Sequence, residues 1–235
     1  MTARTVLITG ASRGIGLELA RQAAARGDRV VACARDVTAE GLDALAAEAD
    51  PSVERETADV TDPASLDALA GRLAGRRIDL LICNAGIYRG RGKLAEATDA
   101  AGYAPEDWAA VFAANVTGVF LTVRALAPLL ARPGGRIAVI SSQMGSNGRA
   151  RGGSYSYRAS KAAATNLARN LALDLKPEGI AVGAYHPGWV RTDMGGAGAD
   201  IEAEDSAAGL LARFDALGPE HTGVFENYDG APMPF

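Results

Sequence analysis

TGASRGIG, residues 9–16, follows a run of branched apolar residues and precedes an alanine-rich stretch of helical spacing from about Ile15 to Arg26. Glycines at such a strand-to-helix turn let the backbone approach a pyrophosphate, which the positive end of the helix dipole stabilises. The spacing is Gly-x-x-x-Gly-x-Gly, and a tight turn without a ligand is the alternative interpretation. The strand before it and the helix after it favour a nucleotide cradle, whose binding residues we expect to be Gly10, Ser12, Arg13, Gly14, Ile15 and Gly16.

Short runs rich in branched apolar residues alternate with longer stretches of helical spacing along the whole chain. This alternation is typical of βαβ units around a parallel sheet. The early runs lack two-residue alternation, as do strands that are covered on both faces. We therefore predict an α/β fold with seven strands, at Thr5–Thr9, Arg29–Ala34, Val53–Thr57, Asp79–Cys83, Arg136–Ser141, Ile180–Tyr185 and Gly223–Asn227.

Proline and glycine mark the boundaries of the expected helices. Asp62 before Pro63, and Ala104 before Pro105, place a proline at the first position of a helix. Glycine or proline also follows most helical stretches, so the connections are short and no linker divides the chain. We expect residues 1–235 to form a single domain.

Composition excludes several classes of protein. The 24 lysines and arginines against 28 acidic residues give a formal net charge of -4, without the basic excess typical of nucleic-acid-binding proteins. No apolar run approaches the roughly 18 residues of a membrane-spanning helix, so we expect a cytoplasmic protein without a membrane partner. Cys33 and Cys83 lie in apolar runs and are expected to be buried reduced thiols. Two histidines in the chain argue against a metal centre.

The residues after the second expected strand bear on the choice of dinucleotide. An acidic residue there usually binds the ribose hydroxyls, whereas a basic one accommodates a 2'-phosphate. This chain has Ala34 and Arg35 at that point, and Arg13 lies in the glycine turn on the same rim. Guanidinium groups bind phosphate through a planar fork of donors, which favours NADP(H). The alternative is a pair of solvated surface arginines, with the field of Arg35 reduced by Asp36.

YRASK, residues 157–161, carries the most specific chemical signal. Four residues separate Tyr157 from Lys161 and bring both onto one helix face. A lysine ammonium beside a phenol favours the phenolate, and we expect it to lower the tyrosine pKa toward the working pH of a general acid or base. Ordinary helix surface is the alternative for this pair alone.

TGASRGIG, CNAG (83–86), Asn115, ISS (140–142) and YRASK together resemble the successive motifs of the classical short-chain dehydrogenase/reductase family. The resemblance covers the whole chain. It implies a Rossmann-type doubly wound sheet with helices on both faces, and hydride transfer between a nicotinamide cofactor and a carbonyl or alcohol.

The resemblance also implies a role for particular residues. Ser142 would hydrogen-bond the substrate oxygen, Tyr157 would exchange its proton, Lys161 would tune Tyr157 and hold the nicotinamide ribose, and Asn115 would fix a water of a proton relay. Ser141 competes with Ser142, and because successive strand residues face opposite ways we expect only one to serve. Further cofactor contacts are implied for Asp59, Val60, Asn84, Ala85, Gly86, Pro187, Gly188, Val190 and Thr192. Asp59 as a helix cap, Asn84 as a turn residue and Asn115 as a helix-kink residue are the alternatives.

SSQMGS, HPGWVRTDMGG and NYDGAPMPF are similar to a narrower group, the C-factor and sniffer-type carbonyl reductases. That similarity implies NADPH-dependent reduction of aldehydes, ketones or quinones, and a homodimer or homotetramer formed through the helices around residues 115–130 and 157–175. Two other functions stay open: a nucleotide-binding regulator of the same fold, and a carrier-linked β-ketoacyl reductase. Arginines around the expected pocket would suit an anionic substrate or a carrier, or form a solvated edge.

Overall fold

Seven parallel strands form one continuous sheet in the computed structural model, which describes residues 3–49 and 51–235. Their spatial order is β3-β2-β1-β4-β5-β6-β7. The strands are β1 (Thr5–Thr9), β2 (Arg29–Ala34), β3 (Val53–Thr57), β4 (Leu80–Cys83), β5 (Arg136–Ile140), β6 (Ala181–His186) and β7 (Phe225–Asn227). The order reverses between β1 and β4, and ligands of open α/β sheets bind at the carboxyl ends of the strands at such a point.

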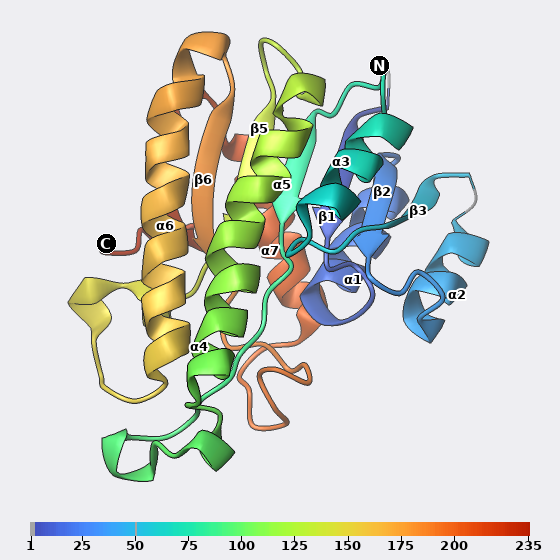
Figure 1. Ribbon diagram of the computed structural model, residues 1–235. Coiled ribbons are helices and arrows are strands. Elements are labelled where there is room, and N and C mark those ends of the chain that lie inside the picture. The colour runs from blue at the N-terminus through green and yellow to red at the C-terminus, as the bar shows by residue number, and fades with distance from the viewer. Residues whose placement is uncertain (1–2, 50) are drawn as a thin grey trace.

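Helices cover both faces of the sheet, as Figure 1 shows. On one face α3 (Pro63–Arg72), α5 (Gly118–Leu126) and α6 (Tyr155–Leu175) bury their apolar side chains against the strands. On the other face α1 (Gly14–Ala25), α2 (Glu40–Glu48) and α7 (Ala203–Ala216) do the same. The short α4 (Pro105–Phe112) leads into α5. This arrangement confirms the predicted doubly wound α/β fold.

The predicted strands are all present, and their bounds are correct or shifted by one or two residues. β1, β2 and β3 have the predicted limits. β4 begins at Leu80, and the carboxylate of the preceding Asp79 accepts from the backbone N–H of Thr5 at 2.9 Å. β6 extends to His186, and β7 is reduced to three residues. Asp62 caps α3 by accepting a hydrogen bond from Ala64 N at 2.9 Å, as its position before Pro63 predicts.

Residues Asp99–Leu129, which include α4 and α5, are apolar and long enough to cross a membrane by length and composition. Half of their most apolar window is buried inside the protein, where α5 packs on α3 and α4 packs on α6. The segment is thus a helical layer of the fold with one buried side. Asn115 and Arg124 interrupt the segment, so it contains no uninterrupted apolar run of the roughly 18 residues considered in the sequence.

Both cysteines are free and buried, as expected. Cys33 lies in β2 and Cys83 ends β4. Burial raises the pKa of Cys83 to about 12 and raises that of Cys33 still further. The thiolate is the reactive form, so both thiols are inert at neutral pH.

Candidate active site

The glycine turn after β1 packs directly against the segment that follows β4. Gly10 has a φ of +68°, and a Cβ there would lie 2.8 Å from the Cα of Ala85. A Cβ on Gly16 would lie 2.2 Å from the carbonyl oxygen of Gly10. Asn84 secures the turn by donating from Nδ2 to the carbonyls of Thr9 and Gly10, both at 3.0 Å. Only glycine fits at these two positions, so the backbone itself forms the surface of the cradle.

The start of α1 has the features of an anion site. Arg13 is its N-cap residue and makes no side-chain hydrogen bond to the first turn, which also contains no acidic residue. The first N–H groups of a helix lack intrahelical partners and carry partial positive charge. Thr192 reaches over the turn, since a Cβ on Gly14 would lie 3.3 Å from its Cγ2. Ser12, Ile15 and Thr192 are all partly buried here, so the residues present fit a bound pyrophosphate.

The two arginines expected to bind the 2'-phosphate differ in their contacts. Arg35 is exposed immediately after β2. Arg13 instead pairs with Asp193 at 2.6 Å, and both side chains are about three-quarters exposed, at 75% and 77%. Such exposed pairs contribute little free energy, so Asp193 competes only weakly with a phosphate for Arg13.

Asp59 and Val60 follow β3 on the same rim and are partly buried. Burial works to raise the pKa of Asp59, but hydrogen bonds from Thr61 and the charge of Arg35 outweigh it, so this pKa is lowered. Both bonds go to one carboxylate oxygen, Oδ1, at 2.8 Å from Thr61 N and 2.7 Å from Thr61 Oγ1. Asp59 is therefore a turn-forming residue whose Oδ2 is left for a further donor.

Tyr157 and Lys161 lie one turn apart on the buried side of α6, at 8% and 5% exposure. Lys161 Nζ donates to the carbonyl of Ile140, the last residue of β5, at 2.8 Å, and lies 5.7 Å from the centre of the Tyr157 ring. Ser142 follows β5 by two residues and stands close enough to the Tyr157 hydroxyl to stabilise its phenolate. Strand β5 and helix α6 thus bring together the three side chains expected to act on the substrate.

Burial dominates the protonation of this group. It raises the pKa of Tyr157 to about 12, although Ser142 acts in the opposite direction. It also lowers the pKa of Lys161 to about 8. The expectation that the tyrosine pKa is lowered is wrong for this structure, because burial of the phenol outweighs the groups that favour its phenolate. Tyr157 is a protonated phenol at neutral pH.

The two serines after β5 face opposite ways, as the strand geometry predicts. Ser141 Oγ donates to the carbonyl of Lys161 at 3.1 Å and lies 2.6 Å from Thr165 Oγ1. It therefore joins β5 to α6. Ser142 Oγ accepts from Met144 N at 3.1 Å and faces Tyr157. This geometry supports Ser142 as the serine that contacts substrate.

Asn115 lies in a π-helical turn, residues Ala113–Thr117, between α4 and α5. Its amide holds the backbone of Ile87, accepting from the N–H at 2.8 Å and donating to the carbonyl at 2.9 Å. The second amide proton goes to Ser160 Oγ at 3.0 Å. A Cβ on Gly86 would lie 3.0 Å from Asn115 Oδ1. Asn115 thus clamps the CNAG segment to α6, and it also lies at a helix irregularity of the kind found at functional sites.

The turn after β6 closes the site from the other side. Pro187 is buried, and Gly188 has a φ of +88°. A Cβ on Gly188 would lie 2.4 Å from Ile201 Cδ1, so the turn packs against the end of the following loop. Val190 is 3% exposed. His186, just before this turn, is buried, and burial lowers its pKa to about 4, so it is neutral at physiological pH.

Sequence reasoning missed Tyr88. Its ring stacks on Tyr157 with centroids 4.3 Å apart, and its hydroxyl lies 2.6 Å from Ser154 Oγ. Arg91 covers Tyr88, 4.7 Å from the ring centroid, and donates to the carbonyl of Met194 at 2.8 Å. A tyrosine four residues after Asn84 has no recognisable pattern, so only the three-dimensional contact reveals it.

Three arginines around the pocket have local partners, and one of these partners is a carboxylate. Arg89 pairs with Asp107 at 2.6 Å, and Arg149 donates to Gln143 Oε1 at 3.2 Å. Arg158 donates to the carbonyl of Met144 at 3.4 Å. These contacts tie loops together, which favours the solvated-edge interpretation of the basic rim over the anionic-substrate one.

Comparison with known proteins identifies the family. The family model described as short chain dehydrogenase matches residues 4–202. The chain is 40% identical over 171 residues to the C-signal protein of Myxococcus xanthus, covering 72% of this chain and 99% of that protein. It is 32% identical over 216 residues to the 3-oxoacyl-acyl-carrier-protein reductase of Escherichia coli (strain K12), covering 91% and 82%.

A solved structure, a carbonyl reductase from Pseudomonas aeruginosa PAO1 in complex with NADP, is similar over the full length of both chains, with 37% identity and a TM-score of 0.87. The resemblance to the C-factor and carbonyl reductase group is thereby confirmed. The chain belongs to the short-chain dehydrogenase family.

Proposed function

We propose that this protein is an NADP(H)-dependent oxidoreductase that reduces the carbonyl group of an aldehyde, ketone or quinone to an alcohol. The observation that carries the proposal is the buried group of Ser142, Tyr157 and Lys161 beside a backbone cradle at the switch point of the sheet. The similarity to a carbonyl reductase crystallised with NADP supports the choice of cofactor and reaction.

The cofactor would lie along the carboxyl ends of β1, β2 and β4. The start of α1 and Thr192 would hold the pyrophosphate, Arg35 the 2'-phosphate, and Asp59 and Val60 the adenine. Asn84, Ala85 and Gly86 would line the nicotinamide side, with Pro187, Gly188 and Val190 opposite. When bound, the cofactor supplies a hydride to the carbonyl carbon.

The chain's own residues supply the proton and the charge stabilisation. Tyr157 is a protonated phenol at neutral pH and would give its proton to the carbonyl oxygen as the hydride reaches the carbon. Ser142 would hydrogen-bond that oxygen and hold it at the phenol. The Lys161 ammonium, on the same helix face, would stabilise the phenolate that remains until solvent returns the proton. One hydride and one proton together convert the carbonyl to the alcohol.

Reduction of a β-ketoacyl group on a carrier protein is a second candidate. The similarity to the carrier-protein reductase of Escherichia coli over 91% of this chain favours it. The loop 191–200 after β6 is short, and the exposed Arg151 stands in the loop before α6, where a carrier's acidic surface would approach. A regulator that binds nucleotide without turnover is a third, suggested by the similarity to C-signal.

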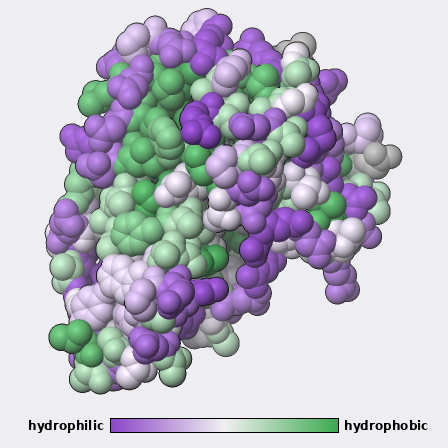
Figure 2. Space-filling model, in the orientation of Figure 1, coloured by the Kyte–Doolittle hydropathy of each residue, from purple (hydrophilic) through white to green (hydrophobic). Residues whose placement is uncertain are grey.

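We also propose that two or four copies assemble through α5 and α6. Phe120 on α5 is 45% exposed and Leu173 on α6 is 68% exposed. Figure 2 shows hydrophobic surface extending over these helices. A second copy would cover it. The buried reduced thiols suit a cytoplasmic location.

The test is oxidation of NADPH by the purified protein, followed by the loss of its absorbance, with a panel of free aldehydes, ketones and quinones and with carrier-tethered β-ketoacyl groups. NADH is run alongside. Turnover of free carbonyl compounds with NADPH supports the proposal. Turnover of tethered substrates alone would assign the carrier-linked reaction, and tight NADPH binding without turnover of any substrate would favour the regulator.

A further inference from the structure

A cavity opens at the opposite edge of the sheet from the candidate active site. It has a volume of about 510 Å³ and is lined by Ala3, Arg4, Thr5, Arg29, Arg76, Arg77, Asp79, Gly134 and Arg136. Thr5, Arg29 and Arg136 are the first residues of β1, β2 and β5, and Asp79 precedes β4. The active-site residues follow the last residues of these strands. At roughly 3.3 Å per residue, the five residues of β1 separate the two sites by about 17 Å.

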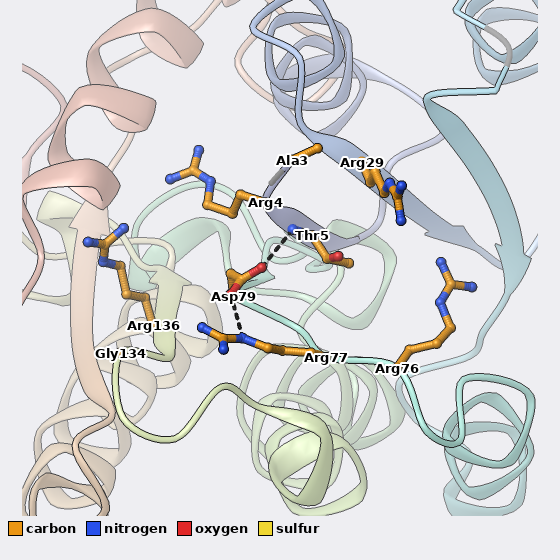
Figure 3. A pocket seen from close by; sticks show the side chains of 9 residues that line it. All are labelled: Ala3, Arg4, Thr5, Arg29, Arg76, Arg77, Asp79, Gly134 and Arg136. Carbon is orange, nitrogen blue, oxygen red and sulfur yellow. Dashed lines mark hydrogen bonds and ion pairs between the residues drawn. The ribbon is translucent and has the colours of Figure 1, made fainter. Parts of the chain in front are cut away.

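Arginine dominates the lining of this cavity. Five of the nine lining residues are arginines and one is a carboxylate, in a chain whose formal net charge is -4. The concentration of positive charge is therefore local rather than a reflection of overall composition. Figure 3 shows Asp79 in the middle of the cavity with arginine side chains on both sides of it.

The single carboxylate of Asp79 cannot balance the charge of five arginines, and both of its oxygens already have partners. Oδ2 accepts from Thr5 N at 2.9 Å, and Oδ1 pairs with Arg77 Nε at 2.9 Å. Outside the lining, Arg4 pairs with Asp28 at 2.8 Å and Arg76 with Glu54 at 2.6 Å. Three of the five guanidinium groups thus have a carboxylate partner.

Arg29 and Arg136 are different. Among residues 3–49 and 51–235, neither has a carboxylate within ion-pair distance. Arg136 Nε donates to the carbonyl of Leu217 at 2.8 Å, which fixes the guanidinium and leaves its two terminal nitrogens for another acceptor. Arg77 likewise uses only Nε on Asp79. The cavity therefore presents several fixed, charged donors without acceptors.

We propose that this cavity binds an oligophosphate anion. Guanidinium groups stay charged at every physiological pH, and their planar donor forks match phosphate oxygens. A volume near 510 Å³ falls in the range of small-ligand sites, and charges distributed around it suit a chain of phosphates better than one compact anion. Among residues 3–49 and 51–235, the lining contains no aromatic side chain on which a base could stack, so recognition concerns the phosphates. A free oligophosphate and the phosphate tail of a nucleotide share this chemistry.

The experiment is isothermal titration of the purified, untagged protein with sodium tripolyphosphate, in the presence of saturating NADPH so that the cofactor site is filled. We expect one site per chain, with an affinity that falls steeply as salt increases. Arg29→Gln with Arg136→Gln should weaken binding at least tenfold. Arg21→Gln removes one charge from the exposed surface of α1, outside the cavity, is the charge-matched control for Arg29→Gln alone, and should change the affinity less than twofold.

Several outcomes would overturn the proposal: no binding by the wild type, equal weakening by Arg21→Gln, or unchanged binding by the double variant. Thermal melting checks that each variant is folded, and Arg29→Gln alone, expected to weaken binding about threefold, serves if the double variant is unstable. Orthophosphate should bind at least tenfold more weakly than tripolyphosphate, and equal affinity would contradict an oligophosphate site. If ATP binds with the affinity of tripolyphosphate, the cavity recognises the phosphates alone. If ATP binds more tightly, the ligand is a nucleotide.

Discussion

At the carboxyl edge of the sheet, Ser142, Tyr157 and Lys161 are less than a tenth exposed, and neighbouring backbone groups or side chains hold each of them. At the amino edge, arginines line an open cavity and pair with carboxylates near the surface. Both edges are built by the same strands, yet burial changes the chemistry of only one. The pKa of Tyr157 rises and that of Lys161 falls where water is excluded. The comparison teaches that burial shifts the pKa values of groups that can transfer protons, whereas solvent-exposed charges attract ions to a surface.

The largest effect is expected at the buried edge. Lys161→Ala removes the ammonium that we propose stabilises the phenolate of Tyr157, and kcat/KM for carbonyl reduction should fall about 10³-fold, within the range of general acid–base effects. Lys176→Ala, at the exposed end of α6, is the matched control and should be unchanged. Steady-state rates with NADPH measure both. Similar losses in the two variants would show that burial of Lys161 has no catalytic consequence.

Between the two extremes lies Arg35, an exposed charge on the active-site rim. Arg35→Gln should weaken NADPH binding about 10- to 100-fold, since a charge-assisted hydrogen bond contributes roughly 1.5–3 kcal/mol. NADH binding should change less than threefold. Arg13→Gln should also weaken NADPH binding, because its exposed pair with Asp193 competes only weakly with a phosphate. Fluorescence titration of the cofactors checks these values, and equal losses for NADPH and NADH would contradict the phosphate assignment.

Packing at the cradle is a separate test of the buried edge. Gly16→Ala places a Cβ 2.2 Å from the Gly10 carbonyl, and should lower the free energy of unfolding by about 1–3 kcal/mol and weaken cofactor binding. Gly71→Ala in α3 is the control, because a Cβ there meets no atom within 4 Å. It should raise stability by about 0.5–1 kcal/mol. Denaturant unfolding measures both, and equal shifts would mean that the turn is not tightly packed.

The protonation of Lys161 predicts how the reaction depends on pH. Its pKa of about 8 in the folded protein means that the ammonium is present below pH 8 and lost above it. Reduction should therefore slow as pH rises through about 8, approaching tenfold per pH unit. Tyr157, with a pKa of about 12, stays protonated throughout.

The predicted fall in rate above pH 8 differs from the effect of Lys161 on stability. Between about pH 8 and the reference lysine value of 10.5, the unfolded chain binds more protons at Lys161 than the folded protein, so the contribution of this group makes stability rise with pH. Rates and melting temperatures measured over the same pH series separate the two effects. A rate that stays constant up to pH 10 would contradict the role assigned to the ammonium.

The smallest effect is expected at the amino edge. Glu54→Gln removes the partner of Arg76, in a pair whose side chains are 37% and 43% exposed. Exposed pairs contribute about 0–1 kcal/mol, so the melting temperature should change little. Releasing Arg76 should instead tighten tripolyphosphate binding about twofold or more. Weaker binding of tripolyphosphate by Glu54→Gln would contradict the proposal that the arginines of this edge bind an anion.

Strand positions, the glycine cradle and the Tyr157–Lys161 pair could be predicted from the sequence because each depends on local spacing. The contacts of Asn115 and Tyr88 could not, since Ile87, Ser160 and Tyr157 meet them only after the strands are ordered in space. The predicted direction of the shift in the Tyr157 pKa was wrong for a related reason. Spacing places Lys161 beside Tyr157, but it does not reveal burial or the Ile140 carbonyl that binds the ammonium.

The arginine cavity shows the same limit at the other edge. Arg29 and Arg136 each begin a strand, and Arg77 lies shortly before another. Their convergence requires the strand order, because β2, β1, β4 and β5 are neighbours in the sheet but not all neighbours in the chain.

The central claim is that the buried phenol of Tyr157 donates the proton during carbonyl reduction, and Tyr157→Phe tests it most directly. The variant keeps the ring that stacks on Tyr88 and removes only the hydroxyl. Single-turnover oxidation of bound NADPH by a reactive carbonyl substrate should slow about 10³-fold or more, while NADPH binds with unchanged affinity. A variant that oxidises NADPH at the wild-type rate would contradict the account.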